Sequence, residues 1–524
     1  MISRTDAQVR RPLRWMRKTV MRAPAQSEKQ PLEVESHTVV IAPEPVPGAN
    51  LVGYLQAEMG LGEAARKLGR ALDRAGVSFS EIAYQRTESR QHHPFEQQRP
   101  AAALYDTNII CLNASQLRDF LADVGIDFFA GRYSIGVWFW ETTVFPEENL
   151  EGFRFVDEVW VSSEFVRNVI SAETALPVFV APLPVEEPRE PHLSRADLDL
   201  PEGFLYLFSF DYFSVFERKN PLATVEAFKQ AFAPGEGPVL VLKSINGHRK
   251  RTAFKRLIDA TRGRPDIHVI DGYVSADEKN AMMAACDCYV SLHRSEGFGL
   301  TMAEAMSYAR PVIATGYSGN LEFMNDENSY LVPYTLTEIP GGSAYPAGAH
   351  WADPDLIAAA TLMRRVYEHQ DEAWARGKRG HDDILRNFSL DRTADFVAGR
   401  LSAARERRAS ALTNLNVPIL IGDQVVGKRV GAGLAKNASR WRPRSLLRRF
   451  LMRALWPYLA DQHKFNTAVL DALTILQRST EEGLRRLLQL EAALKERDTL
   501  DEDSHDSSIR SSARLDVTVE EGDR

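Results

Sequence analysis

Short apolar runs alternate with amphipathic stretches along most of the chain. In the first part of the sequence, β-rich runs begin at residues 38, 51, 108, 133, 158 and 177. Between two of them, residues 61–76 have the pattern of a helix that stops at Gly76. Buried runs that alternate with helices are typical of parallel α/β units. We therefore predict a first Rossmann-like domain over residues 37–185.

A second series of apolar runs follows a connector, rich in proline and acidic residues, that starts at residue 182. These runs begin at residues 204, 238, 267, 288, 311 and 329, and a helical segment at 388–408 closes the series. The pattern predicts an α/β fold class with two Rossmann-like domains that face a cleft, the second over residues 186–408. In such sheets, ligands bind outside the carboxyl ends of the strands.

The two ends of the chain have a different pattern. Residues 1–36 form a polar, arginine-rich arm and residues 500–524 a polar tail, and we expect both to be disordered. Residues 409–499 are predicted to be a helical extension. Within it, residues 440–459 carry six arginines, no acid and one apolar stripe, which predicts a basic amphipathic helix. Leucines near heptad spacing over 469–494 give a weaker coiled-coil pattern.

Composition and charge restrict the classes of function. The formal net charge of −7 argues against a dedicated nucleic-acid binder, which needs a basic surface. Three cysteines cannot build a disulfide framework, and the N-terminal residues lack the apolar core of a secretory signal. No run of about 18 apolar residues occurs, so no membrane-spanning helix is predicted. From the sequence we expect a cytoplasmic protein.

The stretch HRSEGFGLTMAEAM combines a glycine-rich turn with two glutamates. Gly297 and Gly299 lie between a predicted strand and a predicted helix, so a ligand can approach the main chain there, and the free N–H groups at 299–301 suit a phosphate. Glu296 and Glu304 cannot bind that phosphate, but ionised carboxylates accept hydrogen bonds from sugar hydroxyls. A nucleotide sugar satisfies both features. A plain surface turn is the simpler alternative.

Residues 296–304, EGFGLTMAE, resemble the E-x7-E motif of retaining GT-B glycosyltransferases of family 4, and AMSYARPVIATGYSGNLEFM resembles the segment that follows in those enzymes. The resemblance runs from about residue 50 to 400. It implies the GT-B fold, contact of Glu304 with the ribose, and contact of Glu296 with donor-sugar hydroxyls. The backbone implied to meet sugar and phosphate is that of Gly297, Phe298, Gly299, Leu300 and Thr301. It also implies retained anomeric configuration, no metal and no cofactor besides the nucleoside diphosphate sugar donor.

Without a metal, cationic side chains must stabilise the leaving diphosphate. In the segment FSFDYFSVFERKNPL, Lys219 matches the lysine that the family carries after the first strand of the second domain. The family arginine expected some six residues earlier is absent, because Phe213 stands there, and Arg218 is the nearest substitute. Lys243, at the end of the next run, is a further donor-binding candidate. In the alternative interpretation, Arg218 and Lys219 only begin a solvated helix.

Gly60-Leu-Gly62 resembles the glycine loop that lies beneath the donor phosphates in family 4 enzymes, with Gly62 permitting the close approach. The loop also spells G-x-G-x-x-A, and Glu81 follows about 20 residues later, as in the dinucleotide fingerprint of dehydrogenases. That alternative is disfavoured, because QAEM separates the loop from its strand and a dehydrogenase does not explain Glu296 and Glu304. Asp197-Leu-Asp199 lies in the connector and does not suit a metal-dependent GT-A transferase.

A tryptophan-rich element beginning WFWETTVFP at Trp138 resembles one found in some family 4 members. Trp138, Trp140 and Glu141 would bind the acceptor by stacking and hydrogen bonding, although a buried aromatic cluster explains the pattern equally well. His293 is a donor-binding candidate beside the glycine-rich turn, but a lone histidine at a strand end is often structural. The histidine that many family members carry in the N-terminal cleft is unassigned, because Asn113 stands at the comparable place.

These features predict a hexosyltransferase of polysaccharide biosynthesis that uses a glycan or lipid-linked glycan acceptor. By resemblance alone, the expected donor is GDP-mannose. The basic helix at 440–459 would bind an anionic membrane surface, and residues 469–494 would form a homo-oligomer; alternatively, 440–459 packs on the catalytic body or forms a dimer contact. A non-catalytic scaffold that binds a nucleotide sugar is the other function class left open.

Overall fold

The computed structural model describes residues 39–341 and 344–414. The chain divides into two units, Met1–Ser410 and Ala411–Arg524. The predictions made for 1–36, for most of 409–499, including 440–459 and 469–494, and for 500–524 therefore lie outside the described residues. Within the described ranges, no helix is long and apolar enough to cross a membrane. The three cysteines are free and buried.

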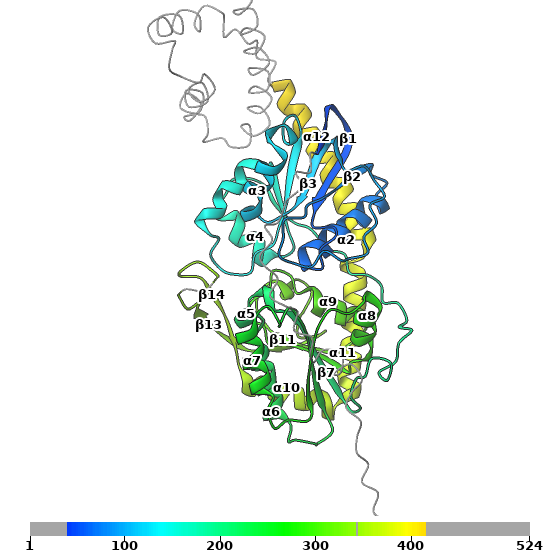
Figure 1. The fold of residues 1–524 in the computed structure, drawn as a ribbon, viewed down its shortest axis with the longest axis vertical. Coiled ribbons are helices and arrows are strands. Elements are labelled where there is room, and N and C mark those ends of the chain that lie inside the picture. Colours follow the sequence, from blue (N-terminus) through cyan, green and yellow to red (C-terminus); the bar gives the residue numbers. More distant parts are fainter. Residues whose placement is uncertain (1–38, 342–343, 415–524) are drawn as a thin grey trace, which may run out of the picture. The chain divides into compact units, whose positions relative to one another are not determined.

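The first half of the described chain forms a six-stranded parallel sheet (Figure 1). Its strand order is β2-β1-β3-β4-β5-β6. The strands are β1 (Val40–Gly53), β2 (Phe79–Ala83), β3 (Ala102–Cys111), β4 (Tyr133–Trp138), β5 (Glu158–Val161) and β6 (Val178–Val180). The helices of this half are α2 (Gly60–Arg74), α3 (Ala114–Val124), α4 (Glu164–Ser171) and the 3-10 segments η1 (Ile126–Phe128) and η2 (Glu147–Phe155).

Two details of this half differ from the sequence prediction. The runs at residues 38 and 51 belong to one long strand, β1, whose pairing with β3 is irregular between Ile41 and Ala49. Strand β2 was not predicted, because its sequence FSEIA mixes polar with apolar residues. The helix stop at Gly76 is confirmed: the glycine has φ +66° and follows the last turn of α2.

The first sheet separates two apolar cores. Successive residues of a strand point to opposite faces, so Ile109 on β3 joins one core and Ile110 joins the other. The Ile110 core is covered by α3 and α4, and the Ile109 core by α2. Burial on both faces explains why these strands read as nearly continuous apolar runs.

The C-terminal helix α12 (Leu390–Asn414) packs on the first half, which corrects the prediction that 388–408 closes the second. Val397, Leu401 and Ala404 recur at helical spacing and enter the core that holds α2. Phe396 of this helix meets the Trp160 ring of β5 with centroids 5.1 Å apart, and Arg400 lies over the Phe179 ring of β6. Glu158, fully buried at the start of β5, anchors the helix by accepting a hydrogen bond from Arg400 at 2.5 Å.

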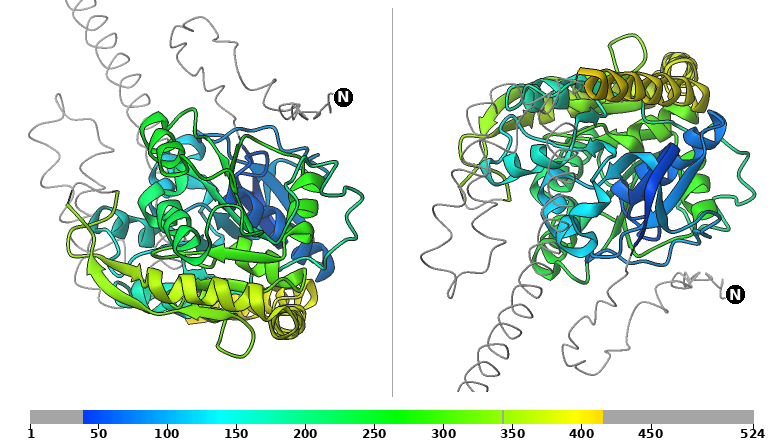
Figure 2. Two further views of the ribbon diagram at one scale, coloured as in Figure 1. Left: turned by 90° about the horizontal axis from the view of Figure 1, so that it is seen from below. Right: turned by 90° about the horizontal axis from the view of Figure 1, so that it is seen from above.

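The second half forms another six-stranded parallel sheet, in the order β12-β11-β10-β7-β8-β9. The strands are β7 (Leu205–Asp211), β8 (Val239–Ile245), β9 (Ile267–Asp271), β10 (Cys288–Ser291), β11 (Val312–Thr315) and β12 (Tyr330–Val332). Helices lie on both sides of it (Figure 2). They are α5 (Phe216–Lys219), α6 (Pro221–Ala231), α7 (Arg251–Ala260), α8 (Ala276–Ala285), α9 (Leu300–Ser307), α10 (Leu356–Glu368), α11 (Gln370–Asn387), η3 (Tyr212–Ser214) and η4 (Gly319–Glu322).

A two-stranded antiparallel hairpin interrupts the second half between β12 and α10. Its strands are β13 (Tyr334–Glu338) and β14 (His350–Pro354). Trp351 and Ile339 form a small separate core, against which Val144 of the first half packs. The hairpin therefore contacts the segment that follows the tryptophan-rich strand β4.

We predict that Glu158→Gln destabilises the protein by about 3 kcal/mol, because removing one partner of a buried ion pair leaves the other without compensation. Glu158 also accepts hydrogen bonds from the Tyr133 hydroxyl at 2.9 Å and from the Trp160 indole at 2.7 Å, in addition to the bond from Arg400. The free energy of unfolding, measured by urea denaturation, checks this. Asp391→Asn, which breaks an exposed pair with Arg74, is the control and should change little; equal effects would contradict the prediction.

Candidate active site

The strand order of the second sheet reverses between β7 and β10. Strands β8 and β9 lie on one side of β7, whereas β10, β11 and β12 lie on the other. Open α/β sheets bind ligands at the carboxyl ends of the strands at such a switch point. The segments that leave these two ends are 212–220 and 292–299. The fold thus brings Arg218, Lys219 and Glu296 to one edge of the sheet.

One carboxylate faces two cations at this edge. Glu296 accepts hydrogen bonds from Lys219 Nζ at 2.5 Å and from Arg218 Nη1 at 2.9 Å. Arg218 also donates to the Ser295 carbonyl at 2.8 Å, and the Glu141 carboxylate lies 3.8 Å away. The side chains of Arg218, Lys219 and Glu296 are only 5%, 16% and 10% exposed. Arg218 and Lys219 therefore do not begin a solvated helix.

Burial and charge act in opposite directions on this cluster. Burial raises the pKa of Glu296, but Lys219 and Arg218 outweigh it and bring the pKa down to about 2. Burial lowers the pKa of Lys219, and Glu296 offsets part of that. Burial also lowers the pKa of Arg218, yet the carboxylates of Glu296 and Glu141 raise it above its ordinary value. Glu296 and Arg218 are both charged at neutral pH.

Three non-glycine residues with positive φ surround the cluster. Val215 (φ +61°) and Asn220 (φ +55°) flank the single turn of α5, which carries both cations. The third is Ser318 (φ +76°), whose hydroxyl oxygen accepts a hydrogen bond from the backbone N–H of Glu296 at 2.8 Å. Such conformations cost on the order of 1–3 kcal/mol each and gather at functional sites. The surrounding structure holds these conformations, and their position around Arg218 and Glu296 makes this edge a candidate site.

Helix α9 begins directly after the glycine-rich turn. Its N-cap, Gly299, has φ +95° and provides no side-chain cap, so the N–H groups of Leu300 and Thr301 have no partner within the helix. Phe298 is buried against Phe323 and belongs to the core. A Cβ on Gly297 would lie 3.0 Å from the Trp140 carbonyl oxygen. A side chain at residue 297 would therefore crowd the Trp140 backbone of the first half.

The second glutamate of the motif has a different environment. Glu304, on α9, accepts a hydrogen bond from Lys279 Nζ of α8 at 3.0 Å. Its side chain is 16% exposed, whereas that of Lys279 is 46% exposed. A carboxylate offers about four acceptor positions, so Glu304 can still accept bonds from ligand hydroxyls.

Two donor-site candidates do not join the cluster. His293 is fully buried, with Nδ1 3.0 Å from the Ser291 hydroxyl and Nε2 3.1 Å from Asn320 Oδ1. Burial lowers its pKa, which favours the neutral, structural role. Lys243, on β8, donates to the Ser244 carbonyl at 3.0 Å and to the Gly272 carbonyl, and burial lowers its pKa to about 8. It connects the ends of β8 and β9.

The tryptophan-rich element has one residue in the hydrophobic core and another beside the charged cluster. Trp138 is 1% exposed and packs against Phe145 and Phe153, so its assignment to acceptor binding is wrong. Trp140 is partly buried, and its indole donates to the Val144 carbonyl at 2.9 Å. Glu141 approaches Arg218 and is the member of this element that reaches the charged cluster.

The glycine loop of the first half lies where β1 ends, but its details differ from the prediction. Gly60 and Gly62 are both inside α2. A Cβ on Gly62 would lie 2.5 Å from the Tyr54 carbonyl oxygen and 2.6 Å from that of Ala57. These two carbonyl oxygens leave no room for a side chain at residue 62, so packing within the first half explains the glycine there. A Cβ on Gly60 would meet no atom within 4 Å.

Several residues of the site were not predicted. Ser162 and Ser163, which follow β5, both donate to the Gly297 carbonyl, at 2.9 and 2.8 Å. Ser295 donates to the Glu141 carbonyl. The first half thus contacts the motif segment directly. In the sequence, the only signal was the position of the two serines at the end of an apolar run.

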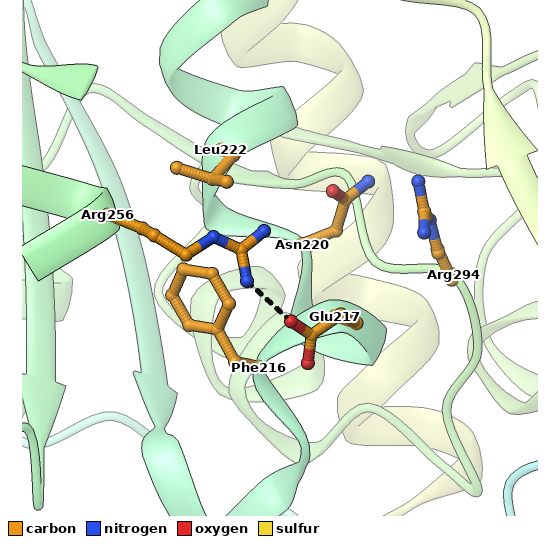
Figure 3. A pocket seen from close by; sticks show the side chains of 6 residues that line it. All are labelled: Phe216, Glu217, Asn220, Leu222, Arg256 and Arg294. Carbon is orange, nitrogen blue, oxygen red and sulfur yellow. Dashed lines mark hydrogen bonds and ion pairs between the residues drawn. The ribbon is translucent and has the colours of Figure 1, made fainter. Parts of the chain in front are cut away.

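A small pocket of about 180 Å³ lies beside α5 (Figure 3). It is lined by Phe216, Glu217, Asn220, Leu222, Arg256 and Arg294. Arg256 pairs with Glu217 at 2.8 Å, and Arg294 pairs with Asp353 at 2.8 Å. Because both arginines have partners and ligand pockets usually measure roughly 300–1,000 Å³, this pocket is not the donor site. Among the described residues, no group of three His, Cys, Asp or Glu side chains is placed to hold a metal.

Residues 208–337 match the family model described as "Glycosyl transferases group 1". This segment is a group 1 glycosyltransferase domain. It contains the switch point and both glutamates of the motif. A trehalose synthase of Rubrobacter xylanophilus is 25% identical over 234 residues, 42% of this chain and 49% of that protein. One of Thermococcus litoralis is 28% identical over 118 residues, 22% of this chain and 24% of that protein. The chain thus spans half or less of the curated relatives it matches.

Two solved structures share the fold. Sucrose-phosphate synthase of Thermosynechococcus elongatus has a TM-score of 0.51 and 17% identity, covering 70% of this chain and 100% of that one. HepE of Anabaena, in complex with UDP and glucose, has a TM-score of 0.50 and 15% identity, covering 68% and 99%. The predicted fold class, GT-B with two Rossmann-like domains, is confirmed.

We predict that Glu296→Gln flattens the acid dependence of stability. A carboxyl whose pKa is about 2 when folded and 4.5 as its ordinary value stabilises the fold above pH 4.5 and loses this contribution, about 3 kcal/mol, as the pH falls towards 2. The free energy of unfolding, measured by urea denaturation between pH 6 and about 3, should fall more steeply for the wild type. Parallel profiles for the two proteins would contradict the assignment.

Proposed function

We propose that the chain is a retaining, metal-independent glycosyltransferase that moves a hexose from a nucleoside diphosphate sugar to a glycan or lipid-linked glycan acceptor. One observation carries the proposal: a buried cluster of two cations and one carboxylate stands at the switch point of a group 1 glycosyltransferase domain. Arg218 and Lys219 place two cationic side chains next to each other at this edge, which suits a diphosphate.

Lys219 and Arg218 are the groups that would stabilise the leaving diphosphate. Charge grows on that group as the bond to the sugar breaks, and preorganised cations at the carboxyl ends of strands are well placed to balance it. The first N–H groups of α9, at Leu300 and Thr301, provide further donors to phosphate oxygens. When the diphosphate takes the hydrogen bonds of Lys219, Glu296 becomes free to accept those of the sugar hydroxyls. Glu304 would accept hydrogen bonds from the ribose.

The acceptor side of the proposal rests on Trp140 and Glu141. Both residues follow β4 in the first half, and Glu141 lies next to Arg218 of the charged cluster.

Two donor sugars are candidates. GDP-mannose is predicted from the family resemblance, whereas the Anabaena HepE structure holds UDP and glucose, so UDP-glucose is the second donor to test. Membrane contact through 440–459, oligomer formation through 469–494 and the cytoplasmic location stay predictions.

The alternative function is a scaffold that binds a nucleotide sugar without turning it over. Two observations favour it. Glu296 is already paired with both cations, and the Arg218 side chain is only 5% exposed to solvent. Phe213 stands where the family arginine was expected, with Lys250 Nζ 5.5 Å above its ring. A scaffold would bind nucleoside diphosphate sugars without releasing nucleoside diphosphate.

Purified full-length protein is expected to release nucleoside diphosphate from its donor, by transfer or by slow hydrolysis. Lys219→Ala should lower kcat about 100-fold, because the leaving group loses a buried cation. The matched control is Lys255→Ala, which removes an exposed lysine of α7 and should keep the wild-type rate. If the wild type releases nucleoside diphosphate from neither UDP-sugars nor GDP-sugars, the scaffold is favoured.

We predict that Glu304→Gln weakens binding of the nucleoside diphosphate about tenfold, because an amide replaces the ionised acceptor that meets the ribose hydroxyls. Isothermal titration calorimetry with UDP, GDP and ADP measures this and identifies the base. Glu226→Gln, on the exposed face of α6, is the control. An unchanged dissociation constant for Glu304→Gln would remove the ribose assignment.

A further inference from the structure

Glu141 brings a carboxylate from the first half of the chain to the charged cluster of the second. Its Oε1 lies 3.8 Å from Arg218 Nη2. The main chain around it is fixed without help from this carboxylate. The Glu141 carbonyl accepts a hydrogen bond from the Ser295 hydroxyl. Two residues later, the Thr143 hydroxyl accepts one from the backbone N–H of His350 at 2.9 Å. The Glu141 side chain can therefore turn while its backbone stays in place.

The two carboxylates that face Arg218 are held differently. Glu296 accepts hydrogen bonds from Arg218 at 2.9 Å and from Lys219 at 2.5 Å, and its side chain is 10% exposed. The contact of Glu141 with Arg218, at 3.8 Å, is an ion pair beyond hydrogen-bond distance, and the Glu141 side chain is 26% exposed. Glu141 is thus the more weakly held carboxylate and the one that solvent reaches more easily.

Arg218 has donor capacity that its present contacts do not use. Its Nη1 donates to the Ser295 carbonyl and to the Glu296 carboxylate. Among the residues that the structure describes, its buried Nε has no hydrogen-bond partner. A guanidinium presents five N–H donors in one plane, and a phosphate group can accept two of them at once. A diphosphate can therefore give Arg218 stronger contacts than Glu141 gives it.

We propose that Glu141 is a displaceable counter-charge: its carboxylate balances Arg218 until the donor diphosphate takes its place, and it then accepts a hydrogen bond from the acceptor hydroxyl. The inference rests on the proposed function, because it takes Arg218 to bind the diphosphate and Glu141 to bind the acceptor. It adds an order to these two events. Donor binding releases the carboxylate that the acceptor needs, so the donor prepares the acceptor site.

The proposal predicts opposite effects of a single substitution. Glu141→Gln keeps the size of the side chain and removes its charge. A carboxylate beside Arg218 opposes an incoming phosphate, so its removal strengthens diphosphate binding. The same change deprives the acceptor hydroxyl of an ionised partner, so turnover slows. Damage to the fold of the site would instead weaken binding and turnover together.

The test compares binding and turnover in the full-length protein. Glu141→Gln is expected to lower the calorimetric dissociation constant of UDP or GDP, whichever the wild type binds more tightly, about fivefold. It should also lower kcat for release of the nucleoside diphosphate from its sugar donor about tenfold. The gain in affinity should shrink as the ionic strength is raised, because salt screens the repulsion that the wild-type carboxylate exerts. Glu148→Gln, an exposed glutamate of η2, is the control and should match the wild type in both quantities.

The outcomes separate this inference from the proposed function. A dissociation constant that is unchanged or raised by Glu141→Gln would overturn the counter-charge, and an unchanged kcat would overturn its passage to the acceptor. If the wild-type protein binds nucleoside diphosphate but turns over no donor, the proposed transfer fails, whereas the comparison of dissociation constants still decides whether the diphosphate displaces Glu141. A protein that binds neither UDP nor GDP would overturn both.

Discussion

The structure of the site depends on one charge balance, in which Glu296 pairs with both Arg218 and Lys219 while Glu141 lies 3.8 Å from Arg218. Without Glu296, Arg218 and Lys219 would stand side by side in a dry environment and repel each other. With it, the two cations are held together within the protein. The strained turns at Val215 and Ser318 are the structural cost of bringing these three groups together.

The halves of the chain contribute to this balance in different ways. The second half supplies Arg218, Lys219 and Glu296, from segments that leave β7 and β10. The first half supplies the enclosure, through Glu141 beside the guanidinium and through the serines after β5. Helix α12 returns from the second half and packs into the core of the first, so the chain crosses between the halves twice. A long C-terminal helix thereby becomes part of the N-terminal core.

Much of the fold was readable in the sequence because parallel strands buried on both faces are continuous apolar runs. Strand β2 was missed where polar residues interrupt that pattern, and α12 was misplaced because a periodic apolar stripe says how a helix packs but not on which sheet. The sequence placed Glu296, Arg218 and Lys219 among the site residues, but it did not predict the pairing of Glu296 with both cations. The sequence could not distinguish the roles of Trp138 and Trp140, because only the packing in the structure shows that Trp138 lies in the core.

The Gly297 carbonyl accepts one hydrogen bond from Ser162 and one from Ser163. A carbonyl oxygen has two lone pairs, so the docking point between the halves is saturated and admits no third donor. Both serines and the oxygen would regain equivalent bonds from water on separation, and such an exchange changes the free energy by only about 1 kcal/mol per bond. The contact therefore sets the alignment of the two halves at the motif segment, while most of the stability of their association must come from the other contacts between them.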